Sequence, residues 1–133
     1  MDKIDYELLI KTIDKYSDEI CRVFEKLHRE DMKAKTDIIK YGSFARFERI
    51  EWEDSDEYDI YIRYFDGYYD LYDSSTLKIP VSILFNDEEI DKWIKSKVDK
   101  AMEEKELEQK AIRKRQEEKE RQEYERLKEK FGK

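Results

Sequence analysis

The sequence predicts an α+β domain with an N-terminal amphipathic helix, a four-stranded antiparallel β-meander and a long, charged C-terminal helix. Three observations predict this class. Apolar residues recur at steps of three and four near the N-terminus, they alternate with polar residues between positions 44 and 85, and they return to helical spacing from position 87. We therefore expect the boundaries between elements near residues 36 and 87.

Length and composition bound the organisation of the chain. At 133 residues, 47% of them charged, there is room for one domain. We expect residues 1–103 to form a compact part and residues 104–133 to form a charged helical tail. The formal charge of −7 argues against unspecific nucleic-acid binding, because neutralising phosphates requires a basic face. One cysteine, no long apolar run and no signal-peptide pattern predict a cytoplasmic protein.

The N-terminal helix carries a heptad stripe of apolar residues. The stripe consists of Tyr6, Leu9, Ile13, Tyr16, Ile20, Val23 and Leu27. Because a small sheet can cover only part of so long a stripe, we expect these residues to form the seam of a homodimer.

The meander is predicted from alternation and turn signals. Its first strand is Phe44–Glu53, in which Ile50 and Trp52 fall on one face and Phe47, Arg49 and Glu51 on the other. Strands Tyr58–Phe65 and Tyr68–Asp73 then meet at Asp66-Gly67, a dipeptide typical of a two-residue type I′ turn. That turn would place Arg63 opposite Asp70 and Ile62 opposite Leu71. Leu77–Ile83 is the fourth strand, at an edge because Pro80 has no N–H to donate.

This register divides the hairpin into a core face and a second, aromatic face. The core face consists of Ile60, Ile62, Tyr64, Tyr69 and Leu71. The other face consists of Asp59, Tyr61, Arg63, Phe65, Tyr68, Asp70 and Tyr72. Aromatic anchors with negative charge among them suit a basic surface on another protein, so we expect this face to bind a protein partner.

The C-terminal helix begins at an Asn86 or Asp87 cap and has an apolar stripe from Ile90 to Met102. Residues 113–123 contain no apolar side chain. The tail is therefore either a solvated single helix or one arm of an intermolecular coiled coil.

Two short segments resemble the signature of polymerase-β-type nucleotidyltransferases. They are Tyr41–Arg46 (YGSFAR) and Glu57–Ile60 (EYDI). The resemblance implies that Gly42 and Ser43 hold nucleotide phosphates, and that Glu57 and Asp59, together with Asp70, bind Mg²⁺. Phe47 stands where this family usually has glycine. A nucleotidyltransferase-like or nucleotide-sequestering domain is thus the alternative function, and we expect neither nucleotide binding nor turnover, and no cofactor or metal.

A second resemblance covers nearly the whole chain. After the heptad helix come an aromatic meander ending in Ile79–Phe85, an acidic helix start at Asn86–Glu89, and a charged tail closing in Glu123–Gly132. This order is similar to small proteins of tailed bacteriophages and prophages, which implies a phage origin but supplies no activity. By analogy with small acidic phage proteins that inhibit host factors, including CRISPR effectors, we expect a non-enzymatic protein that binds and inhibits a host protein.

Overall fold

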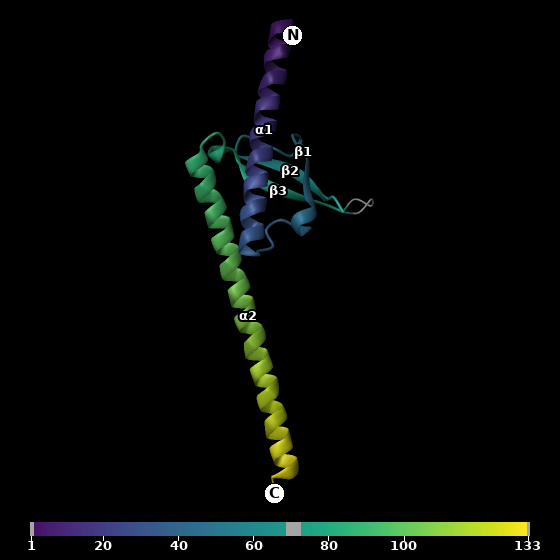
Figure 1. Cartoon of the computed structure of the whole chain (residues 1–133), viewed down its shortest axis with the longest axis vertical. Coiled ribbons are helices and arrows are strands. Elements are labelled where there is room, and N and C mark those ends of the chain that lie inside the picture. Colours follow the sequence, from purple (N-terminus) through teal and green to yellow (C-terminus); the bar gives the residue numbers. More distant parts are fainter. Residues whose placement is uncertain (1, 69–72, 133) are drawn as a thin grey trace.

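The computed structural model describes residues 2–68 and 73–132 and confirms the α+β class. Two long helices accompany an antiparallel sheet (Figure 1). The elements are α1 (Lys3–Ala34), β1 (Ala45–Glu51), β2 (Asp59–Asp66), β3 (Ser74–Pro80) and α2 (Asp87–Phe131), with short 3₁₀ turns at Gly42–Phe44 and Val81–Ile83. In the described residues the sheet has three strands, in the order β1-β2-β3, rather than the four that the sequence predicts.

A buried carboxylate organises the end of α1. Lys35 adopts the left-handed conformation, with φ of 56°, which ends the helix. The Asp31 carboxylate, 1% exposed, accepts hydrogen bonds from the backbone N–H of Ile38 (3.1 Å) and of Ile39 (3.0 Å), and from the hydroxyl of Thr36. One side chain therefore holds the turn that leads the chain from the helix towards the sheet.

The central strand, β2, has the predicted inner face but a different partner. Ile60, Ile62 and Tyr64 are buried, as expected from their alternation. The predicted hairpin register is wrong, because Ile62 lies opposite Leu77. The Gly67 N–H donates to the carbonyl of Phe44 (2.9 Å) instead of closing a two-residue turn.

Strand β3 overlaps the predicted fourth strand, Leu77–Ile83, and pairs directly with β2. Its pairing places Arg63 opposite Thr76 rather than opposite Asp70. Residues 69–72 of the predicted strand Tyr68–Asp73 lie outside the described residues, so the expected core positions Tyr69 and Leu71 do too.

A β-bulge in β1 changes which side chains share a face. Phe47 lies opposite Tyr64, but the next pair joins Arg49 to Arg63, so Glu48 is the extra residue. Phe47 and Ile50 consequently lie on the same, inner face, whereas strict alternation predicts opposite faces. Arg49 keeps its predicted place on the other face.

The core lies between α1, the inner face of the sheet and the start of α2. Its buried members include Ile20, Val23, Phe24 and Leu27 of α1, Ile60, Ile62, Tyr64 and Ile79 of the sheet, and Ile90 and Ile94 of α2. Phe24 lies at the centre, with its ring centroid 5.5 Å from that of Tyr64 and 6.1 Å from that of Phe47.

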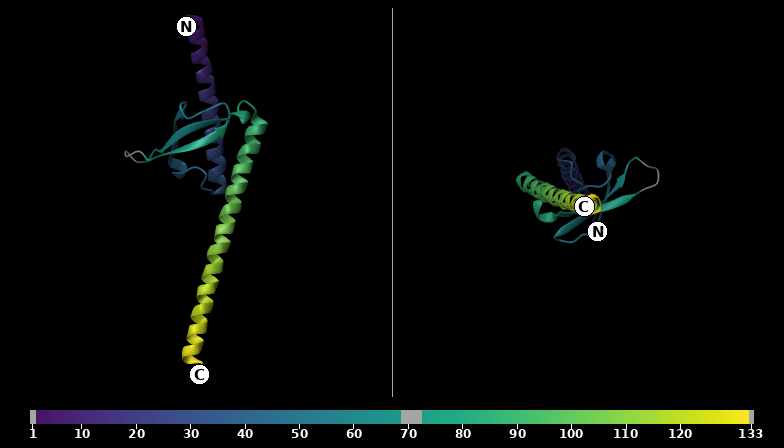
Figure 2. Two further views of the ribbon diagram at one scale, coloured as in Figure 1. Left: turned by 180° about the vertical axis from the view of Figure 1, so that it is seen from behind. Right: turned by 90° about the horizontal axis from the view of Figure 1, so that it is seen from below.

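α2 runs beside the second half of α1 and in the same direction (Figure 1). Asn86 caps it, as predicted, by accepting a hydrogen bond from the Glu89 N–H at 3.2 Å. An ion pair of 2.8 Å joins Arg22 of α1 to Asp87 of α2. The two helices are staggered, so that the N-terminal end of α1 and the C-terminal end of α2 project from opposite ends of the molecule (Figure 2).

The projecting part of α2 begins about four turns into the helix. Lys105 Nζ still donates to the carbonyl of Lys35 at 2.6 Å. Each described residue after Ala101 is exposed. The tail is thus held by its continuity with a helix whose first turns are packed in the core.

Candidate interaction surface

The face of the sheet turned away from α1, which we call the outer sheet face, is defined by the strand register. Residues paired across antiparallel strands point to the same face. Three rows follow: Glu51–Tyr61–Lys78, Arg49–Arg63–Thr76 and Arg46–Phe65–Ser74. The β1 and β3 members of these rows are exposed except for half-buried Glu51, and those of β2 are half-buried between them. This exposure means that neither described helix covers the outer sheet face.

The outer sheet face is more basic than the hairpin alone predicts. Four cations, Arg46, Arg49, Arg63 and Lys78, share it with the carboxylates of Glu51 and Asp59. The Arg49 guanidinium lies 3.1 Å from Glu51 through Nε and 3.9 Å from Glu48 of the bulge through Nη1. The expected acidic character depended on the aspartates of one hairpin, whereas the added positive charges come from the neighbouring strands β1 and β3.

The structure describes five of the seven predicted interaction residues. Asp59, Tyr61, Arg63 and Phe65 alternate along β2 and share the outer sheet face. Tyr68 follows the strand and is 63% exposed, and its ring packs against that of Phe44 with centroids 4.7 Å apart. Asp70 and Tyr72 lie outside the described residues.

An acidic turn fixes one end of this face. The Asp56 carboxylate accepts the backbone N–H groups of Asp59 and Tyr58, each at 2.8 Å. These two hydrogen bonds, that of Asp59 first, lower the pKa of Asp56 below its usual range. The turn therefore remains charged at neutral pH and sets where β2 begins.

The structure separates the residues of the alternative nucleotide site. Gly42 and Ser43 precede β1, which starts opposite Asp66 at the far end of β2. Glu57 and Asp59 lie at the opposite end of this eight-residue strand, about 23 Å away at the usual rise per residue. Among the residues that the structure describes, no group of three His, Cys, Asp or Glu side chains is placed to hold a metal ion. The two motifs therefore do not form the arrangement that the resemblance implies.

The Gly-Ser segment has a structural role instead. Gly42 has a φ of 55°, a conformation that suits glycine. Its carbonyl lies 2.7 Å from His28 Nε2, and the His28 ring stacks on Phe24 with centroids 5.9 Å apart. Because a carbonyl only accepts hydrogen bonds, Nε2 carries the proton, and His28 ties the start of β1 to α1.

The predicted dimer seam is divided between the core and the surface. Ile20, Val23 and Leu27 are fully buried against the sheet and are not available to a partner. Tyr6 and Leu9 are 57% and 44% exposed, in the part of α1 that extends past the sheet. The remaining two seam residues, Ile13 and Tyr16, are half-buried and line an apolar groove of about 340 Å³ together with Trp52 and Val81.

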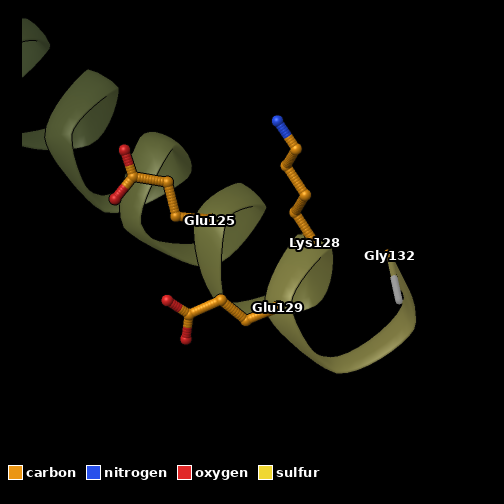
Figure 3. Close-up of a pocket in the computed structure, with 4 residues that line it drawn as sticks. All are labelled: Glu125, Lys128, Glu129 and Gly132. Atoms are coloured by element: carbon orange, nitrogen blue, oxygen red, sulfur yellow. The ribbon is translucent and has the colours of Figure 1, made fainter.

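A hollow near the end of α2 is lined by Glu125, Lys128, Glu129 and Gly132 (Figure 3). Its three long side chains come from one helix and diverge from one another. Such an open surface does not surround a ligand.

No helix in residues 2–68 or 73–132 is both long and apolar enough to span a membrane.

No family model, curated protein or solved structure matches the chain. The function is therefore inferred from the surface itself.

Sequence reasoning missed Arg46 and Lys78 as members of the outer sheet face, whereas Arg49 was predicted on the face away from Ile50. Arg46 and Arg49 are three positions apart, a spacing that alternation assigns to opposite faces. The bulge between them brings both to one face. Lys78 joins them through its pairing with Tyr61, and local sequence carries no signal for that long-range register.

Proposed function

We propose that this protein is a non-enzymatic, phage-type protein that binds a host protein through the outer sheet face and inhibits it in the host cytoplasm. The observation that carries the binding role is the uncovered central strand, where Tyr61 and Phe65 flank Arg63. Tyrosine and arginine are enriched among the residues that dominate binding energy. When a partner binds, the contacts that surround such residues exclude water from them. The phage origin and the inhibition follow from the sequence resemblance.

Tyr61→Ala is expected to weaken capture of the partner by roughly 1 to 3 kcal/mol in binding free energy, since it removes a rigid aromatic anchor from the centre of the face. The measurement is a pull-down from bacterial host lysate, followed by titration of the captured protein. The affinity should also fall as salt is raised, because charges surround the anchor.

The matched control is Tyr124→Ala, a change to a tyrosine that is 65% exposed on the projecting part of α2. A truncation lacking residues 104–133 tests the tail as the alternative surface. Unchanged capture by Tyr61→Ala, or loss of capture by the truncation alone, would contradict the assignment to the sheet.

We also propose that the N-terminal arm of α1, residues 3–16, associates with a second copy. Ile4, Leu8 and Leu9 are 71%, 63% and 44% exposed on this arm, and the apolar groove beside Tyr16 continues the same surface. A two-fold axis would place each arm in the groove of the other copy, so one interface covers both apolar surfaces.

Leu9→Asp is expected to convert a micromolar dimer into a monomer, because it puts a charge into the apolar interface. Sedimentation equilibrium measures the mass. Leu127→Asp is the matched control, at a leucine 41% exposed on α2. A wild-type monomer would refute the proposal, and dissociation by Leu127→Asp alone would move the seam to the tail.

A further inference from the structure

We propose that Arg63 is an anion-binding anchor, and that its ligand is a carboxylate on an acidic segment of the partner protein. This inference rests on the proposed function and adds the chemistry of the partner. The expected charge of that partner is opposite to the one that the hairpin sequence suggests.

The surroundings of Arg63 combine partial burial with a charge that is not paired by any residue the structure describes. Its side chain lies on the central strand, half-buried, with Tyr61 and Phe65 two residues away on the same face. Within the described residues Arg63 belongs to no ion pair. A guanidinium between two rings is partly shielded from water, so an anion that reaches it is held more strongly than at an exposed site.

The neighbour of Arg63 across the sheet is a second cation, which makes the binding of an anion more favourable. Arg49 lies directly opposite it, and like charges in this position destabilise a sheet. Arg49 is compensated on its own strand by Glu51, at 3.1 Å, whereas no carboxylate among the described residues forms an ion pair with Arg63. A carboxylate bound at Arg63 would relieve the repulsion, and the planar guanidinium can hold it through two parallel hydrogen bonds.

The charges around Arg63 favour a protein segment over a nucleic acid. Glu51 and Asp59 share the same face, and the acidic turn that contains Asp56 lies at the edge where β2 begins. A nucleic acid carries a phosphate at every nucleotide and would have to pass these carboxylates. A peptide can place one carboxylate at Arg63 and lay apolar side chains on Tyr61 and Phe65.

The test is fluorescence anisotropy with a short labelled peptide in which glutamate alternates with leucine. We expect wild-type protein to bind it and Arg63→Gln to bind it about tenfold more weakly or worse, the loss of a charge-assisted hydrogen bond. Arg63→Lys, which keeps the charge but loses the planar fork, should bind with intermediate affinity. Arg29→Gln, at an exposed arginine of α1, is the matched control and should bind as wild type.

A peptide with lysine in place of glutamate and an oligothymidylate of similar length complete the design. Absence of glutamate-peptide binding, equal binding by wild type and Arg63→Gln, or tighter binding of the oligothymidylate would each overturn the inference. Melting curves of each variant confirm that it is folded. If lysate capture depends on Tyr61 while the glutamate peptide binds nothing, the carboxylate inference fails and the proposed function stands. If Tyr61→Ala changes no capture, the proposed function fails by itself.

Discussion

Phe24→Ala is expected to lower the free energy of unfolding by about 3 to 5 kcal/mol, the usual cost of truncating a buried phenylalanine. The side chain is 2% exposed, and it touches three ring systems, those of His28, Phe47 and Tyr64. The cavity would lie between α1 and the sheet. Neither element can move to fill it without disturbing its packing against the other. Urea unfolding followed by circular dichroism measures the change.

Phe131→Ala is the matched control for Phe24→Ala, because this ring is 73% exposed at the end of α2. Its unfolding midpoint should stay within error of wild type. Similar losses in the two variants would mean that Phe24 is not the centre of the core.

Asp31→Ala is expected to lower the free energy of unfolding by about 2 to 4 kcal/mol, although it removes only a small side chain. The change leaves the N–H groups of Ile38 and Ile39 without an acceptor, and each unsatisfied buried group costs about 1 to 3 kcal/mol. Since small domains have total stabilities of roughly 5 to 15 kcal/mol, this loss unfolds a sizeable fraction of molecules on mild heating.

The measurement for Asp31→Ala is the thermal midpoint, together with amide exchange at Ile38 and Ile39. Asp37→Ala removes an exposed carboxylate from the same turn and should shift the midpoint very little. Retained protection of both amides in Asp31→Ala would show that another group accepts these hydrogen bonds.

The sequence predicted those features of the fold that depend on local periodicity. The alternation of Ile60, Ile62 and Tyr64 indicated the inner face of β2, and Asn86 marked the start of α2. Both signals are contained within a few residues, where backbone geometry decides which side chains share a face.

Long-range pairing was the part that could not be predicted. Asp66-Gly67 is a strong local turn signal, yet the Gly67 N–H bonds to Phe44, a contact that only the folded sheet supplies. The bulge at Glu48 likewise has no local signal. Consequently the β2 members of the candidate surface, such as Tyr61 and Arg63, were predicted on one face, but Arg46 and Lys78 beside them were not anticipated.

The parallel, staggered packing of α1 and α2 has a hydrodynamic consequence. α2 alone, with 45 residues, is about 68 Å long, and α1 extends the molecule in the opposite direction. A rod of this kind has far more friction in water than a sphere of its 16.4 kDa mass. Even a monomer will therefore elute early from a sizing column and tumble slowly, as a larger particle would.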